Sequence, residues 1–335
     1  MAQIAAPRSD TATRRTALAV VGSLAALAVL LQLVEPQRFA WVQTFFIILG
    51  SLLIQAVPFV LVGALASAVI EVFVPIGTLE RLAELPRPLQ LPAAALAGIA
   101  MPICECGSVP VARRLAAKGL LPSAAITFML AAPVVNPVVI ASTFVAYRGR
   151  EAMWAMVAGR FLLGMLVAVV VGWTVGAVSK EGLLKPNPDE RHAHPVTLGR
   201  PESRWRRLFL HMGSDFLFMG RYLVLGATLA ALVQTFLPAP WIERVAALPV
   251  LSIVTMMVLA ALMSLCSESD AFIAASFVQF GPSSQLAFLV FGPMVDLKLA
   301  ALYAGTFRRG FLRTVVISAF ATTLVATMWL QVVIG

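Results

Sequence analysis

The chain has 335 residues, of which 60% are hydrophobic and only 12% charged, and its mean hydropathy is +0.91. A soluble chain is about 45–50% apolar and about 25% charged, so the composition excludes a water-soluble enzyme, a secreted disulfide scaffold and a disordered chain. The net charge of +9 could indicate a nucleic-acid-binding protein. In so apolar a chain, however, basic residues are typical of cytoplasmic loops. We therefore expect a membrane protein that binds no nucleic acid.

In chain order, residues 1–15 are predicted to be a cytoplasmic N-terminus and residues 16–34 a transmembrane helix. A cleaved signal peptide is the alternative, but the residues after this helix offer no small-residue cleavage site. Further apolar segments follow at 41–74, 91–119, 121–147 and 152–178. The polar stretch 180–207 is predicted to be a basic cytoplasmic linker, and more apolar segments follow at 208–237, 249–280, 283–307 and 314–334.

The later apolar segments repeat the earlier ones. At offsets of 163 or 160 residues, distinctive positions coincide: Gly63 with Gly226, Phe73 with Phe236, Cys106 with Cys266, Pro122 with Pro282, Pro133 with Pro293, and Asn136 with Asp296. Matches of glycine, proline and cysteine between apolar segments are hard to obtain by chance. The sequence therefore predicts two membrane repeats, residues 41–179 and 208–335.

The distribution of Lys and Arg predicts how the repeats cross the membrane. If every segment crosses once, the basic loop residues divide evenly between the two sides. If the segments around Cys104 and Cys266 enter and return on one side, most of those residues become cytoplasmic, as the positive-inside rule requires. The predicted fold is therefore an all-α polytopic membrane protein with two inverted repeats, each containing a broken or re-entrant hairpin, plus an N-terminal helix. Full crossings, which would make the repeats parallel, are the alternative.

Four related places are predicted to interrupt the helices, at residues 102–108, 132–137, 265–270 and 292–296. Non-helical backbone at membrane depth must line a cavity or be buried in protein, and carboxylates there are functional candidates. In transporters with inverted repeats the substrate site lies where such breaks meet. The predicted substrate-binding residues at the breaks are Cys104, Glu105, Cys106, Ser108, Asn136, Cys266, Glu268, Asp270 and Asp296. Hairpin tips that merely reach water are the alternative.

The three cysteines of the chain all lie at two of these breaks. In an extended segment Cys104 and Cys106 would point to one side and could chelate one ion. A helix beginning at Ser108 would favour their thiolate forms. Thiolates select Cu(I), zinc and thiophilic metalloids, so Cys104, Cys106 and Cys266 are predicted metal ligands. Simple packing of small apolar side chains is the competing interpretation.

Other polar residues are weaker candidates. His192 and His194 lie in the linker, where we expect solvation rather than metal binding. Asp215 and Arg221 are candidates for an ion pair within one span. Lys298 could neutralise an empty site as a resident counter-ion, or extend to the membrane surface. The chain has no Gly-Lys-Ser/Thr phosphate loop, which argues against ATP hydrolysis.

The segment PICECGSVPV at 102–111, followed by Arg113-Arg114 and Lys118-Gly119, resembles the signature of the ArsP-type predicted permeases. The segment FMLAAPVVNP at 128–137 resembles the second signature of that family. The resemblance extends from about Trp41 to the C-terminus. It adds Gly107 and Pro133 to the predicted site, and Pro293 follows as the repeat partner of Pro133. The second half departs from the pattern because Cys266 has no neighbouring Cys-x-Cys partner.

The resemblance implies a permease, because family members include exporters of trivalent organoarsenicals and others associated with copper or zinc handling. We therefore predict a cell-membrane permease, not an enzyme and without a cofactor, that exports a thiophilic metal or metalloid by alternating access. Its expected partners are the lipid bilayer, the substrate, and a second membrane subunit or another copy of the chain. The alternatives are a small-anion permease, a non-transporting subunit of a complex, and a membrane thiol redox enzyme using Cys104 and Cys106.

Overall fold

The computed structural model describes residues 40–74, 86–101, 103–178, 203–236, 249–308 and 310–334. The predicted N-terminus, the predicted helix at 16–34, and His192 and His194 lie outside these residues, as does most of the predicted linker. The chain divides into two units, Met1–Ile47 and Ile48–Gly335. In the first unit the described residues are the beginning of helix α2, and the account below concerns the second.

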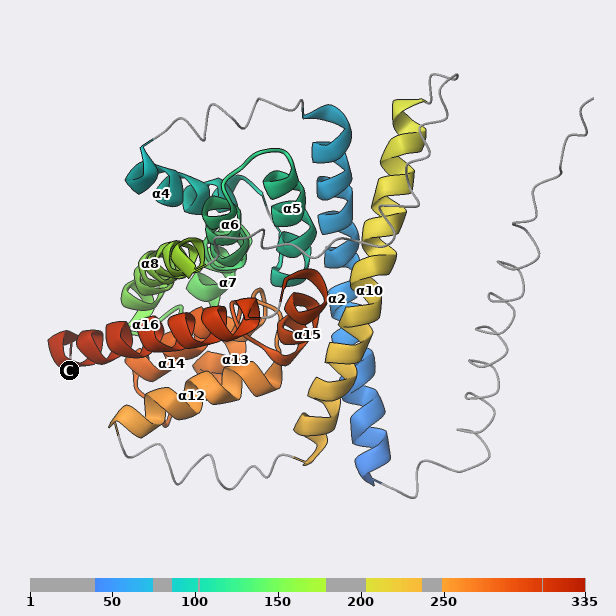
Figure 1. Ribbon diagram of the computed structural model, residues 1–335. Coiled ribbons are helices and arrows are strands. Elements are labelled where there is room, and N and C mark those ends of the chain that lie inside the picture. Colours follow the sequence, from blue (N-terminus) through green and yellow to red (C-terminus); the bar gives the residue numbers. More distant parts are fainter. Residues whose placement is uncertain are drawn as a thin grey trace, which may run out of the picture. The chain divides into compact units, whose positions relative to one another are not determined.

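Each regular element in the described part of the chain is a helix (Figure 1). The first half contains α2 (Ala40–Phe73), α4 (Arg87–Ala97), the short η2 (Gly98–Ala100), α5 (Glu105–Ala117), α6 (Pro122–Val135), α7 (Pro137–Ala146) and α8 (Met153–Val178). The second half contains α10 (Arg204–Phe236), α12 (Pro249–Met263), α13 (Asp270–Ser276), α14 (Pro282–Phe291), α15 (Leu297–Thr306) and α16 (Phe311–Ile334). The last residues of the predicted linker are thus the first turn of α10.

Five stretches among the described residues are long and apolar enough to cross a membrane: α2, α6 with α7, α8, α10 and α16. The shorter helices at Leu89–Ala100, Val250–Met263 and Pro282–Phe291 are also apolar. Many large apolar side chains on these helices are exposed, which suits contact with lipid. The predicted all-α polytopic membrane fold is confirmed.

The helix bounds follow the offsets found in the sequence. An offset of 160 carries the whole of α7 onto α15 and the first residue of α6 onto that of α14, and an offset of 163 carries the end of α2 onto the end of α10. Packing follows the same scheme: α4 and α8 contact α6 in the first half, as α12 and α16 contact α14 in the second. The two halves therefore share the order of these helices and the packing around α6 and α14.

Two of the predicted breaks differ in detail from the structure. Helix α6 continues through Pro133 to Val135, and the break is confined to Asn136. Pro133 removes one hydrogen bond from the last turn, whereas Pro137 forces the residue before it out of the helical region. Asn136 accordingly has φ −55° and ψ 133°. At the first break, α5 begins at Glu105 rather than at the expected Ser108.

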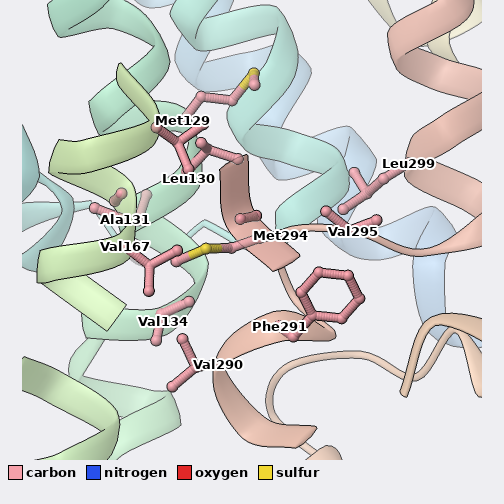
Figure 2. Close-up of a cluster of buried hydrophobic side chains, with 14 of the residues drawn as sticks. Met129, Leu130, Ala131, Val134, Val167, Val290, Phe291, Met294, Val295 and Leu299 are labelled. Carbon is pink, nitrogen blue, oxygen red and sulfur yellow. The ribbon is translucent and has the colours of Figure 1, made fainter. Parts of the chain in front are cut away.

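Buried residues of α6 and α14 belong to one apolar core cluster (Figure 2). Figure 2 shows Val134 of α6 close to Val290 of α14, and it draws Met129 and Leu130 of α6 and Phe291 of α14 in the same cluster. Met294 lies between them and, like these five residues, is buried. The apolar core therefore joins the two halves next to the breaks that follow α6 and α14.

Candidate substrate site at the helix breaks

The first break lies before the N-terminus of α5, and its described residues are Met101, Ile103 and Cys104. Cys104 is the N-cap residue, with φ −74° and ψ 173°, and its carbonyl accepts from Ser108 N at 3.0 Å. The Ser108 hydroxyl donates to the Glu105 carbonyl at 2.9 Å. Because Cys106 already lies in the first turn of the helix, the extended geometry expected to align it with Cys104 is absent. Glu105 stands where the helix dipole favours an acidic side chain.

The break at Ser264–Ser269 separates α12 from α13, and we call it the second break because it lies in the second half of the chain. Ser264 has a positive φ of 47°, which turns the chain sharply after α12. Cys266 and Ser267 are buried in this turn, Glu268 is half-buried, and Asp270 is the buried first residue of α13. The segment thus places a thiol, a hydroxyl and two carboxyl groups in the protein interior.

The repeat-related residues Asn136 and Asp296 have the same structural role. Asn136 caps α7, with Oδ1 accepting from Val138 N at 2.9 Å. Asp296 caps α15, with Oδ1 accepting from Leu299 N at 2.6 Å. Both are buried, and both satisfy donors that the start of a helix leaves free. The caps differ in one respect, which is that Asp296 can carry a negative charge.

A fully buried ion pair joins the second break to the first half of the chain. Arg160 of α8 is 0% exposed and donates to both carboxylate oxygens of Asp270, at 2.8 and 2.7 Å. Its guanidinium also donates to the Thr143 hydroxyl at 2.9 Å and to the Ser267 carbonyl at 3.1 Å. This bidentate geometry is the strongest arrangement available to an arginine and a carboxylate.

A second buried ion pair joins the first break to the second half. Lys298 of α15 has its Nζ 3.5 Å from Glu105 Oε1 and 3.7 Å from Asp296 Oδ2. Ser267 connects the two ion pairs, since its hydroxyl donates to Glu105 Oε2 at 3.0 Å while its carbonyl accepts from Arg160. The predicted counter-ion position of Lys298 is thus present, and the lysine is buried rather than extended to the surface.

Glu105 lies at the centre of the predicted site. It is within electrostatic range of the other members of the charged cluster and of every thiol: Cys104, Cys106, Cys266, Glu268, Asp270, Asp296 and Lys298. The three cysteines are buried and free of disulfides. Among the described residues, no group of three or more His, Cys, Asp or Glu side chains stands ready to hold a metal ion. The cluster therefore contains soft and hard donors that are not assembled around one point.

Two repeat-related glycines let the longest helices approach the site closely. A Cβ on Gly63 of α2 would lie 2.3 Å from the Gly107 Cα, and one on Gly226 of α10 would lie 2.7 Å from the Lys298 Cα. Backbone at such distances leaves no room for a side chain. Gly107 therefore has a packing role, and each long helix lies against a helix that carries one partner of the Glu105–Lys298 pair.

The remaining predicted residues lie near the network without forming its charged contacts. Pro133 is buried within α6, and Pro293 is buried in the turn between α14 and α15. Asp215 and Arg221 were the candidates for an ion pair within one span, and the structure shows other contacts for each of them. Asp215 is held instead by Arg114 at 3.1 Å and by the Ser67 hydroxyl at 2.7 Å, while Arg221 lies over the rings of Phe218 and Tyr222.

Three contributors to the network were absent from the predicted site: Arg160, Thr143 and Ser267. An arginine within an apolar span is itself a functional signal, so Arg160 could have been found by the rule applied to the carboxylates. Ser267 and Thr143 carry no such signal, because serine and threonine are common in membrane helices. Their roles depend on residues more than 100 positions away or on a neighbouring helix.

Apolar helices of spanning length around a buried, charged and interrupted centre define a polytopic membrane protein of the transporter class. Comparison with known families identifies the family within this class. The chain belongs to the ArsP_1 family of predicted permeases, whose family model matches residues 41–332. The permease family expected from the signatures is thereby confirmed, and it indicates a transporter rather than an enzyme.

Two relatives each align over 263 residues, or 78% of this chain. The UPF0718 protein YcgR of Bacillus subtilis is 38% identical, and the match covers 88% of its length. A protein of Streptococcus mutans is 32% identical over 86% of its length, and its name provisionally describes a subunit of a two-component membrane permease complex. No solved structure matches the chain.

Proposed function

We propose that this permease moves a thiophilic metal or metalloid across the cell membrane through the site at the helix breaks. The observation that carries the proposal is the burial of all three thiols of the chain at two helix breaks that a hydrogen bond from Ser267 to the buried Glu105 joins. Thiols bind soft metals and trivalent metalloids, and carboxylates bind harder divalent ions. A site with both kinds of donor suits an ion of intermediate character.

The formal charges of the cluster favour a positively charged substrate. Four carboxyl groups (Glu105, Glu268, Asp270 and Asp296) face two basic side chains, Arg160 and Lys298. Burial of unpaired carboxylates is costly, and a bound cation would offset that cost. An anion would instead meet a surplus of negative charge, which argues against the small-anion alternative.

Transport is proposed to occur by alternating access between two inverted repeats, residues 41–179 and 208–335, with the N-terminus and the linker 180–207 cytoplasmic. Two cross-repeat contacts support the repeat interface as the moving part. Glu105 of α5 meets Lys298 of α15, and Asp270 of α13 meets Arg160 of α8. Export is the proposed direction, by analogy with the family.

A second membrane subunit is the proposed partner, with a homo-oligomer as the alternative. The name of the Streptococcus mutans relative supports a two-component arrangement. Expressing the chain alone and together with a membrane protein encoded beside it tests this, because a subunit without independent activity would transport only in the second case.

Flux into proteoliposomes tests the proposed substrate class. We expect the purified chain to move at least one of Zn²⁺, Cu⁺, arsenite and methylarsenite, and not sulfate. The matched variant is Cys104→Ser/Cys106→Ser/Cys266→Ser, which leaves no cysteine in the chain. Thiol reagents should block the parent protein and should have no target in the variant. Parent-level flux in the variant would contradict the proposed role of the thiols.

A further inference from the structure

Five buried atoms of the site have no hydrogen-bond partner; besides Arg160 Nε and Glu268 Oε2, they are Glu105 Oε1, Asp296 Oδ2 and Lys298 Nζ, and the last three lie together. They are the same three atoms that form the stretched ion pairs, at 3.5 and 3.7 Å. Buried polar atoms are nearly always hydrogen-bonded, so three unsatisfied atoms facing one another require an explanation.

The two carboxylates are held in place by their other oxygens. Glu105 Oε2 accepts from the Ser267 hydroxyl at 3.0 Å, and Asp296 Oδ1 accepts from Leu299 N at 2.6 Å. Each side chain is thereby oriented, and each keeps one oxygen free. The free oxygens come from different halves of the chain, and both lie within 4 Å of one ammonium group. This is an oriented pair of oxygen ligands around a positive charge.

The neighbouring Arg160–Asp270 ion pair has the close hydrogen bonds that the Lys298 contact lacks. Arg160 and Asp270 make two hydrogen bonds of 2.8 and 2.7 Å. Lys298 makes none with Nζ, although it is 1% exposed and close to two carboxylates. Its long flexible side chain can also withdraw, whereas the planar fork of an arginine is held in one geometry. The contrast indicates that the Lys298 contact is exchangeable.

We propose that the Lys298 ammonium is a built-in substitute for the transported ion, displaced when a metal cation binds between Glu105 Oε1 and Asp296 Oδ2. This inference rests on the proposed function, because it takes the helix-break site as the transport site. Cys106 and Cys266 lie within electrostatic range of Lys298 and are the nearby soft ligands. Carboxylate and thiolate ligands together suit Zn²⁺.

The exchange of the Lys298 ammonium for the transported ion also narrows the class of substrate. Neutral As(OH)₃ carries no charge to replace that of the lysine, whereas a divalent ion does. No group of three or more His, Cys, Asp or Glu side chains among the described residues is ready to hold a metal ion, and in our proposal the ammonium leaves as the ion binds. Once the ion leaves, Lys298 returns and neutralises the empty site. The empty permease can then change conformation without burying two unpaired carboxylates.

The variant Lys298→Met separates this role from a purely structural one. The empty site of this variant would keep two uncompensated carboxylates. The permease would therefore need a bound ion in order to return to its starting conformation. We therefore expect exchange of radioactive Zn²⁺ between loaded liposomes to persist, while net Zn²⁺ flux falls. The control is Lys118→Met, which removes another buried lysine whose Nζ donates to the carbonyls of Glu71 and Val74 outside the site. In the control, exchange and net flux should change together.

Equilibrium binding gives a second measurement, by titrating Zn²⁺ into purified protein. Removing the internal competitor should tighten binding in Lys298→Met by about tenfold, and Glu105→Gln should weaken it. Unchanged or weaker binding in Lys298→Met, or loss of exchange and net flux in equal proportion, would overturn the inference. Methylarsenite flux in the parent protein without Zn²⁺ binding would preserve the proposed function and overturn the inference alone. Tightened Zn²⁺ binding without flux of any probe would support the displacement of Lys298 by a cation and overturn the proposed transport function.

Discussion

Arg160 and Asp270, 110 residues apart in the sequence, form a bidentate ion pair with no exposure of the arginine. The pair ties α8 of the first half to the beginning of α13 in the second. Ser267 extends it to Glu105 and hence to Lys298. One hydrogen-bonded and charged network therefore holds both broken hairpins, and its parts can be tested separately.

Replacing Arg160 alone should strongly lower the stability of the protein. Arg160→Met leaves Asp270 buried without its partner, and breaking a buried pair in this way costs about 3–5 kcal/mol. The double variant Arg160→Met/Asp270→Leu removes both charges and should recover most of that loss. Thermal unfolding of purified protein in detergent measures both. A double variant as unstable as the single one would mean that the ion pair is not the source of the effect.

The close approach at Gly226 predicts a sharp difference between two glycines of the same helix. Gly226→Ala places a methyl group 2.7 Å from the Lys298 Cα, and overpacking of this kind costs about 1–3 kcal/mol. Gly220→Ala meets nothing within 4 Å and should be neutral or stabilise α10 by about 0.5–1 kcal/mol. The thermal unfolding midpoints of the two variants test this difference. Equal midpoints would show that α10 can move away from α15 without cost.

Asp296 combines a capping role with a charge, and two substitutions separate these. Asp296→Asn keeps a good cap for Leu299 N and should unfold within about 0.5 kcal/mol of the parent protein, whereas Asp296→Leu loses the cap, at about 1 kcal/mol. Both variants remove the charge and should weaken Zn²⁺ binding to a similar extent. Parent-like binding in Asp296→Asn would remove Asp296 from the proposed ligands while leaving its cap intact.

The Ser267 hydroxyl orients Glu105, so its loss should affect stability. Ser267→Ala leaves Glu105 Oε2 buried without its donor, which costs about 1–3 kcal/mol. The matched control is Ser276→Ala, because that hydroxyl is exposed and donates only within its own helix, to the Ile273 carbonyl. Unfolding midpoints of the two variants that agree within error would refute the assigned role of Ser267.

The locations of the breaks could be predicted because they depend on local chemistry. Proline at 137 excludes the residue before it from a helix, and polar residues within apolar segments mark the same places. The start of α5 was placed three residues too late. Cys104 makes no side-chain capping hydrogen bond, so the usual serine, threonine, aspartate or asparagine signal is missing there.

The partners within the site could not be predicted from the sequence. Composition identifies Glu105 and Asp270 as costly groups in a membrane, but it does not say which cation faces which carboxylate. That choice depends on how α5 meets α15 and how α8 meets α13, which are contacts between distant parts of the chain. Repeat symmetry does not help either, because the repeat partner of Lys298 is Val138.

Gly63 and Gly226 also bear on how the surrounding lipid acts on the site. Their neighbours Leu61, Val62, Val224 and Leu225 are exposed on the same helices, while both glycines are buried against the site. We therefore expect a single helix to separate acyl chains from the backbone that carries Glu105 on one flank and Lys298 on the other. A change in bilayer thickness that tilts α2 or α10 acts directly on the spacing of the two charges, so transport rates should depend on the chain length of the lipid in which the protein is reconstituted.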